Sequence, residues 1–202
     1  MIRPWPLISS ATTFDAGLFR VTRDRACSPR TGREHDFHVI HMVDWLMLVP
    51  VTTDGKIVMV RQYRHGSREN GLEVPGGLHD TAGEEPGQGA LRELAEETGY
   101  CAPVDTMLFL GKLRPQPALF TNRIWIYLAQ DVHPVTSPKL DAGEDMETVL
   151  IEPAEVAGLI AGGEISNAMT AVALMMAHSG GYLDSAGRPG DDQKRRMGNV
   201  CT

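Results

Sequence analysis

The feature that most constrains this chain is a glutamate-rich segment, residues 86–98, which begins with a proline and is followed by Gly99. Proline suits the first turn of a helix and glycine the position just past its end, so the segment is predicted to be helical. Residues three and four positions apart share one face of a helix. Glu93, Glu96 and Glu97 are therefore expected to project together, beside a packing side made of apolar residues.

An acidic face of this kind is most often simply exposed to solvent. Here that interpretation fits poorly, because like charges at these spacings each cost roughly 0.2 to 0.5 kcal/mol. Glu96 and Glu97 also lie in the last turn, where the helix dipole disfavours anions. A hard divalent cation would compensate directly, and it retains waters that serve as nucleophiles or meet substrate phosphates. The helix therefore predicts a Mg2+ site, with Mn2+ as an alternative ion.

Composition and charge narrow the class of protein. The chain has 202 residues, of which 42% are apolar and 22% charged, which suits one globular domain with a small appendage. A net charge of -7 opposes binding to nucleic acid, because counterion release needs clustered Lys and Arg. No apolar run approaches a membrane span, and the N-terminal segment lacks the apolar core of a signal peptide. We expect a cytoplasmic protein that binds neither membranes nor nucleic acid.

The order of apolar runs and turn signals predicts an α/β fold with a mixed sheet and packed helices. Residues 17–26 and 35–43 are expected to form a two-stranded ribbon. An Asp-Gly pair at 54–55 indicates a hairpin between the next two strands. The predicted core strands are 45–51, 56–62, 72–74, 106–113, 123–129 and 148–151, and the predicted helices are 86–98, 153–161 and 166–177.

Three regions are expected along the chain. Residues 1–43 form the N-terminal ribbon, predicted to be a dimerisation extension, and residues 44–179 form the catalytic domain. Residues 180–202 are rich in Gly, Asp, Lys and Arg and are predicted to be a mobile tail. A lone two-stranded ribbon is marginal in water, so its apolar side chains need a surface to cover.

The segment from Gly77 to Tyr100 resembles the box of the Nudix hydrolase family, which reads G, five residues, E, seven residues, R-E-U-x-E-E-x-G-U, with U apolar. From Glu84 onward the match is complete, since seven residues precede Arg92 and the rest follows in order. Six residues instead of five separate Gly77 from Glu84. The extra residue falls in the loop, so the helical carboxylates keep their phase.

This resemblance implies the Nudix α/β/α sandwich and a set of residue roles. It implies that Glu93 and Glu97 are metal ligands, that Glu96 is a ligand or orients metal-bound water, and that the Gly76 carbonyl completes the shell. It also implies that Arg92 holds the loop to the helix, and it assigns Glu84 the same supporting role.

Residues upstream resemble the ADP-ribose pyrophosphatase branch, in which an R-Q-Y-R strand and an L-E-x-P-x-G approach precede the box. Here these are residues 61–64 and 72–77. This likeness implies that Arg64 contacts the substrate diphosphate, a role that suits the planar set of donors on its guanidinium. The alternative is that Arg64 is simply an exposed arginine at the end of a strand. Arg61 is a second candidate substrate-binding residue. Pro117 stands where this branch carries a proline-containing substrate loop.

The acidic loop at residues 141–147 precedes a strand, and similar enzymes bring a glutamate from such a loop to the attacking water. Glu144 is the candidate general base, with Asp145 and Glu147 as alternatives. Sequence leaves this choice open, because a base must come within hydrogen-bond reach of that water.

The predicted function is metal-dependent cleavage of the diphosphate in ADP-ribose or another nucleoside-diphosphate sugar, giving a nucleoside monophosphate and a sugar phosphate. One alternative is another substrate, such as a dinucleotide, a coenzyme A derivative or a damaged nucleotide. Another is a Nudix-fold binding or regulatory module without turnover, against which the intact Arg92, Glu93, Glu96 and Glu97 argue. The expected partner is a second copy of the chain. Similar enzymes often exchange such a ribbon between subunits. We expect the ribbon to close the nucleotide end of the partner's site.

Overall fold

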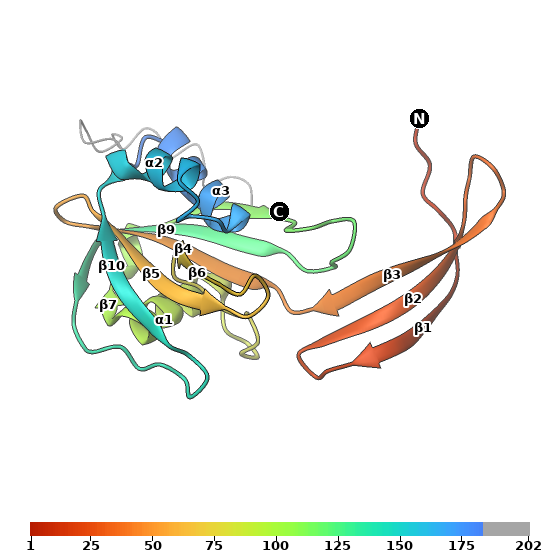
Figure 1. The fold of residues 1–202 in the computed structure, drawn as a ribbon, viewed down its shortest axis with the longest axis horizontal. Coiled ribbons are helices and arrows are strands. Elements are labelled where there is room, and N and C mark those ends of the chain that lie inside the picture. The colour runs from red at the N-terminus through yellow and green to blue at the C-terminus, as the bar shows by residue number, and fades with distance from the viewer. Residues whose placement is uncertain (184–202) are drawn as a thin grey trace. The chain divides into compact units, whose positions relative to one another are not determined.

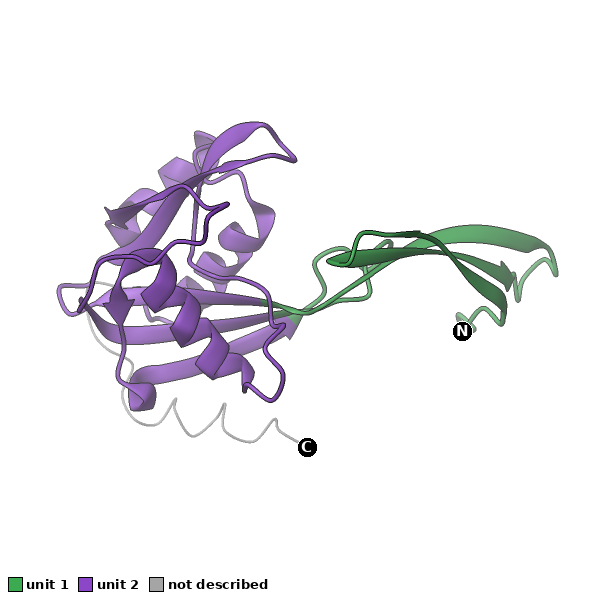
Figure 2. Cartoon of the chain, turned by 90° about the horizontal axis from the view of Figure 1, so that it is seen from below, with its two compact units in different colours: residues 1–45, 113–124 green, residues 46–112, 125–202 purple. Residues whose placement is uncertain are grey.

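The computed structural model describes residues 1–183 and divides into two compact units (Figure 2). Unit 1 comprises residues 1–45 together with 113–124, and unit 2 contains the remainder of the described chain. The predicted tail at 180–202 lies outside the described residues from position 184 onward. None of the helices within residues 1–183 combines the length and the apolar character needed to span a membrane.

Unit 1 contains a three-stranded antiparallel sheet rather than the predicted two-stranded ribbon (Figure 1). Its strands, in their order in the sheet, are β1 (Leu7–Asp15), β2 (Phe19–Cys27) and β3 (Glu34–Met42). The sequence pattern did not indicate β1, because all nine of its residues are exposed and impose no apolar alternation. β1 is defined by its pairing along β2, from Leu7 opposite Ala26 to Asp15 opposite Arg20.

The division of the chain is not the contiguous one predicted at residue 43. The loop at 113–124 groups with the N-terminal strands because it pairs with the end of β3. The Ile40 amide donates to the Leu119 carbonyl at 2.8 Å, and the Thr121 amide donates to the Ile40 carbonyl at 3.0 Å. Residues far apart in sequence therefore form one compact unit.

Unit 2 contains most of a seven-stranded sheet in the order β10-β5-β4-β9-β7, with β6 paired to β5 and β8 paired to β9. The strands are β4 (Trp45–Thr52), β5 (Ile57–Arg64), β6 (Glu69–Glu73), β7 (Tyr100–Cys101), β8 (Met107–Leu113), β9 (Ile124–Pro134) and β10 (Met146–Ile151). The predicted strands are all present. Only β7, two residues long, was not anticipated.

The helices lie on the two faces of this sheet, with α1 (Pro86–Thr98) on one side and α2 (Val156–Ala161) and α3 (Ala168–Ser179) on the other (Figure 1). The predicted helix at 153–161 begins instead as a short 3-10 turn, Pro153–Glu155, before α2. This arrangement is the predicted α/β sandwich.

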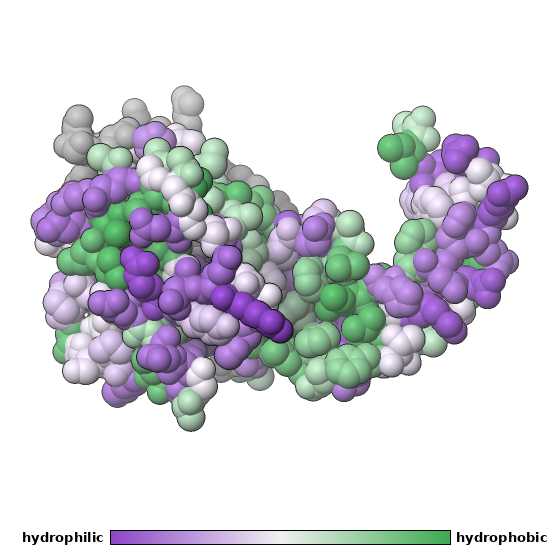
Figure 3. All heavy atoms as spheres, in the orientation of Figure 1, coloured by the Kyte–Doolittle hydropathy of each residue, from purple (hydrophilic) through white to green (hydrophobic). Residues whose placement is uncertain are grey.

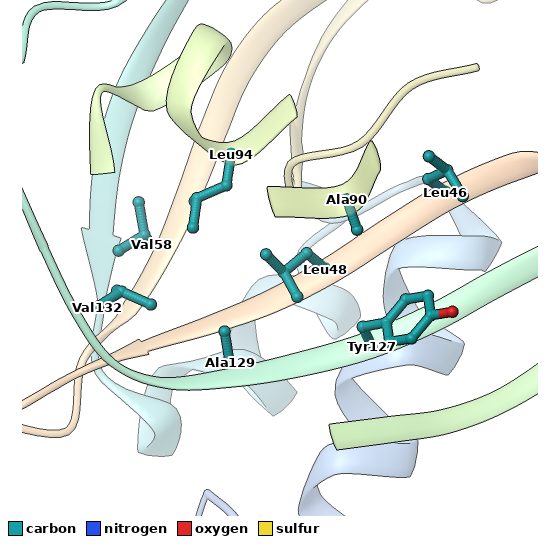
Figure 4. Packing of buried hydrophobic residues seen from close by; sticks show 8 residues of the cluster. All are labelled: Leu46, Leu48, Val58, Ala90, Leu94, Tyr127, Ala129 and Val132. Carbon is teal, nitrogen blue, oxygen red and sulfur yellow. The ribbon is translucent and has the colours of Figure 1, made fainter. Parts of the chain in front are cut away.

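A buried apolar cluster attaches α1 to the sheet (Figure 4). Ala90 and Leu94 of α1 pack against Leu48 of β4 and Val58 of β5, and all four side chains are fully buried. Burial of a Leu or Val side chain contributes about 1.5 to 3 kcal/mol. The cluster therefore fixes the rotation of α1 about its axis, which decides where its glutamates point.

Candidate active site

Helix α1 has the start and end that its sequence predicts. Pro86 lies in the first turn, and Gly99 has a φ of 73°, with its amide donating to the carbonyl of Ala95. Only glycine adopts this left-handed backbone without strain, so the helix ends directly after Glu97 and Thr98. With Leu94 in the core, Glu97 is also turned inward, and only 4% of its surface is exposed.

The glycine pair before α1 is needed for space and not for a left-handed backbone, since neither glycine has positive φ. A Cβ on Gly76 would overlap the carbonyl oxygen of Leu46, and a Cβ on Gly77 would lie 2.5 Å from the carboxyl of Glu93. Gly77 and Leu46 exchange two backbone hydrogen bonds, of 2.9 and 3.1 Å. The two glycines therefore let residues 76–77 lie against β4, and the carboxyl of Glu93 can lie against the backbone of Gly77.

Glu97 is a buried carboxylate with few compensating groups. Its Oε2 accepts a hydrogen bond from the Gly76 amide at 3.0 Å. Burial, together with the charges of Glu93 and Glu144, nevertheless raises the pKa of Glu97 to about 8, although this hydrogen bond and the charge of Arg64 lower it. These four side chains therefore share one electrostatic environment.

Glu93 and Glu96 differ in their surroundings. The Glu93 side chain is 14% exposed, and burial raises its pKa although Arg92 lies 3.0 Å away. The Glu96 side chain is 44% exposed and forms a 2.7 Å ion pair with Arg92. Glu93 and Glu96 therefore both contact Arg92, and the charge of Glu96 also raises the pKa of Glu93.

Arg92 links the loop before the helix to the helix itself. Its Nε and Nη2 donate to the two carboxylate oxygens of Glu84 at 3.2 and 3.4 Å. The same guanidinium contacts Glu93 and Glu96. One arginine therefore holds three of the box glutamates, which is the geometry expected for structural support.

The acidic loop brings the charge of Glu144 to the group. Glu144 acts by its charge on the pKa values of Glu93, Glu97 and Arg64, and Oε2 of Glu144 accepts a hydrogen bond from the Asp141 amide at 3.0 Å. Glu147 pairs across the sheet with Arg61 and faces away with it. The charge of Glu144 therefore reaches this group, and its role as general base stays a prediction.

Arg64 reaches the same environment from the end of β5. Its Nε and Nη2 donate to the two oxygens of Glu73 at 2.8 and 3.0 Å, and these hydrogen bonds raise its pKa, as do the charges of Glu97 and Glu144. Its side chain is still 51% exposed. Val60 pairs with Glu73 across β5 and β6, so Arg64 and Glu73 share the sheet face that carries Val58 and α1.

Sequence reasoning missed Glu73 as a functional residue. It is 4% exposed and also accepts a 2.6 Å hydrogen bond from Asn167, which precedes α3. A signal was present, because Glu73 is a charged residue between apolar neighbours in a strand, and a buried charge requires a partner. Nothing in the local pattern named Asn167, which is 94 residues away.

Two predicted substrate-binding residues lie apart from this group. Arg61 is three positions from Arg64 on β5 and so points to the opposite face, where its Nη2 lies 3.5 Å from Glu164. The arrangement gives its predicted contact with substrate no support. Pro117 lies in unit 1, in the loop between β8 and β9, and its role stays a prediction.

The donor set fits a hard cation in part. Within residues 1–183 no group of three or more His, Cys, Asp or Glu side chains is arranged so that it could hold a metal ion without help from other groups. The Gly76 carbonyl accepts no hydrogen bond from the described residues, whereas the carbonyls of Pro75 and Gly77 on either side accept from β4. An uncommitted carbonyl beside the crowded carboxylates of Glu93 and Glu97 is the oxygen-rich environment that Mg2+ prefers.

Comparison with known proteins identifies the family. The model of the NUDIX domain matches residues 29–170. The chain belongs to the Nudix family. The Nudix domain match starts upstream of residue 44, where the catalytic domain was predicted to begin.

Relatives of this Nudix protein share most of its length. It is 33% identical to an ADP-ribose pyrophosphatase from Mycobacterium tuberculosis (strain ATCC 25618 / H37Rv), over 85% of this chain and 82% of that protein. It is 31% identical to the ADP compounds hydrolase NudE from Escherichia coli (strain K12), over 71% of this chain and 73% of the relative.

A solved structure agrees with the fold. The crystal structure of an ADP compounds hydrolase superposes with a TM-score of 0.77 at 25% identity, covering 89% of this chain and 95% of that one. The predictions of a Nudix-type α/β sandwich and of a Nudix pyrophosphohydrolase are confirmed.

Proposed function

We propose that this Nudix protein hydrolyses the diphosphate of ADP-ribose or another nucleoside-diphosphate sugar, with Mg2+ as its preferred cofactor. The observation that carries the proposal is the grouping of Glu93, Glu97, Glu144 and Arg64 in one electrostatic environment. Three carboxylates beside one arginine suit a site that holds a divalent cation against an anionic diphosphate. The printed activities of the relatives support the choice of substrate.

Glu93, Glu97 and the Gly76 carbonyl are the proposed ligands of the cation. Glu96 is the proposed support for a metal-bound water, which would require it to exchange its contact with Arg92. When bound, the cation would lower the pKa of a coordinated water and neutralise charge on the diphosphate. The raised pKa of Glu97 supports this assignment, because a cation is what would favour its ionised form.

The protein residues complete the reaction. Arg64 binds the diphosphate with the part of its guanidinium that Glu73 leaves exposed. Glu144 accepts the proton of the attacking water as a phosphorus–oxygen bond forms and the anhydride bond to the second phosphoryl group breaks. The products are a nucleoside monophosphate and a sugar phosphate.

The test is a panel of diphosphates incubated with Mg2+ or Mn2+, with products separated chromatographically and phosphate counted after phosphatase treatment. ADP-ribose should give AMP and ribose 5-phosphate, and a chelator should abolish the reaction. A clear preference for a dinucleotide or a coenzyme A derivative would overturn the substrate class. Absence of turnover on the whole panel with both ions would favour a module that binds without catalysis.

We also propose that the protein is a homodimer in which unit 1 packs on the partner. Several large apolar side chains of unit 1 are exposed, and Figure 3 shows apolar residues gathered where Figure 1 draws the turn between β1 and β2. The exposed apolar side chains of unit 1 include Phe14 and Leu18 near this turn and Leu7, Ile8 and Phe37 farther along the strands. Unit 1 carries eight Lys and Arg against five Asp and Glu, a formal charge of +3, which leaves -10 for the rest of the -7 chain. This opposition favours docking onto a second copy.

A further inference from the structure

Asn167 makes two different sets of hydrogen bonds at the start of α3. Its Oδ1 accepts from the amides of Met169 and Thr170 at 2.9 and 3.4 Å, which caps the helix. Its Nδ2 donates to Oε2 of Glu73 at 2.6 Å. A cap needs only an acceptor, and Ser, Thr or Asp would supply one equally well. The amide donor is therefore the property that distinguishes asparagine at this position.

The recipient of that donor is a buried carboxylate that also determines the orientation of Arg64. Oε2 of Glu73 accepts from both Asn167 and Arg64, while among residues 1–183 Oε1 accepts from Arg64 alone. A buried carboxylate is stable in one orientation only if its oxygens are satisfied. Without the Asn167 donor, Glu73 would hold Arg64 through a carboxylate free to turn.

The orientation matters because of what Glu73 leaves exposed on Arg64. Nε and Nη2 are bound to Glu73, and Nη1 has no hydrogen-bond partner among the residues that the structure describes. The guanidinium is planar and rigid, so fixing two of its nitrogens fixes the direction in which the third donates. The charges of Glu97 and Glu144 act on this same guanidinium.

We propose that Asn167 is a positioning residue for substrate binding, which acts through Glu73 to aim the free edge of Arg64 at the diphosphate. The inference rests on the proposed function, in which Arg64 binds that diphosphate. It assigns α3, a helix that carries none of the box residues, a part in substrate recognition. A merely structural Asn167 would cap α3 and leave substrate affinity unchanged.

The test compares Asn167→Ser and Asn167→Asp in the full-length protein. Both keep a capping oxygen, serine lacks the amide donor, and aspartate sets a second carboxylate against Glu73. The probe is a non-hydrolysable methylene analogue of ADP-ribose, with Kd measured by calorimetry and KM and kcat measured with ADP-ribose. The Asn167→Ser variant should have Kd and KM about tenfold higher and a nearly unchanged kcat. Small misplacements of the groups that position a substrate lower enzyme efficiency by up to about 100-fold. Aspartate should raise both constants further.

Arg64→Ala, alone and combined with Asn167→Ser, separates this inference from the function on which it rests. If Asn167 acts through Arg64, the serine change should add no further loss of affinity to Arg64→Ala. An Asn167→Ser protein with normal Kd and KM, beside a weakened Arg64→Ala protein, would overturn the positioning role alone. Unchanged affinity in Arg64→Ala would overturn the substrate role of Arg64 and the positioning role with it. Arg64→Lys, which keeps a charge opposite Glu73, replaces the alanine variant if that protein does not fold.

Discussion

At the residue scale, the charge of Glu97 dominates the candidate site. It is buried beside Glu93 and near Glu144, so its ionised form is unfavourable in the metal-free protein, and its pKa rises to about 8. The same charge is what a divalent cation would bind. Opposite effects on stability and activity are therefore expected when it is neutralised.

Glu97→Gln should abolish most metal-dependent turnover while the fold is retained, because a neutral amide is a weak ligand for a hard cation. The expected loss of kcat/KM is at least about 100-fold, since outer-shell changes alone cost roughly 10- to 100-fold. Activity titrated against Mg2+ concentration measures it. Near-normal turnover at saturating Mg2+, with an unchanged metal requirement, would remove Glu97 from the ligand set.

The same substitution should stabilise the metal-free protein in a pH-dependent manner. Folding raises the pKa of Glu97 from 4.5 to about 8, so the folded state binds the proton more tightly than the unfolded state. The free energy of unfolding therefore falls as pH rises from 4.5 to about 8. Glu97→Gln escapes this loss, so its Tm in chelator should exceed the parent's at pH 8.5 and approach it near pH 4.5.

Melting curves at both pH values test this, with about 2 to 4 °C expected for each kcal/mol in a chain of this size. Glu96→Gln is the matched control, because that side chain is 44% exposed and should give little pH-dependent gain. A lower Tm for Glu97→Gln at pH 8.5 would indicate that the ionised glutamate stabilises the fold.

Arg64 has a structural partner, Glu73, that its sequence position did not reveal, and this partner bears on the effect of Arg64→Ala. Substrate affinity should fall and Tm should fall too, because buried Glu73 would keep only its Asn167 donor. Adding Glu73→Gln should restore much of the Tm by removing the buried charge, without restoring affinity. Calorimetry and thermal melting separate the two effects. If Arg64→Ala leaves Tm unchanged, the pair with Glu73 has no net importance for stability.

At the element scale, the loop before α1 depends on two glycines for different reasons. Gly76 makes room for the backbone of β4, and Gly77 makes room for the carboxyl of Glu93. The first is a contact between backbones and the second is a contact with a side chain. Substitution at the two positions should therefore damage different properties.

Gly76→Ala should mainly lower Tm, since overpacking costs typically about 1 to 3 kcal/mol and more where backbone must move. Gly77→Ala should mainly weaken Mg2+ binding, so that a higher Mg2+ concentration is needed for activity, because Glu93 must shift to admit the new methyl group. Gly158→Ala in α2, where a Cβ meets nothing within 4 Å, is the control and should leave activity unchanged. Melting curves and Mg2+ titrations of the three variants test this difference. Equal behaviour of the Gly76 and Gly77 variants would contradict the distinction.

At the scale of the whole molecule, unit 1 exposes apolar side chains that a monomer would leave in water. Light scattering of the full chain at micromolar concentration should give a dimer mass. A chain beginning at Asp44 should be monomeric and less active. A monomeric full-length protein would defeat the proposal, and a truncated chain that stays dimeric and fully active would show that the N-terminal strands are not what joins the subunits.

The sequence by itself determined the elements whose causes are local. The extent of α1 followed from the proline at its start and Gly99 at its end, and the hairpin between β4 and β5 from its Asp-Gly turn. The phase of Glu93 and Glu97 followed from the helical repeat. Such features depend on neighbours within a few residues, so a single sequence contains their cause.

Only the tertiary structure decided contacts between distant residues. β1 formed because β2 provides pairing groups, and the loop at 113–124 joined unit 1 through Ile40. Glu73 met Asn167 because β6 and the start of α3 come together across 94 residues. Packing in three dimensions sets these partners. Periodicity assigns a residue to a face, whereas burial and the available partners decide what it touches there.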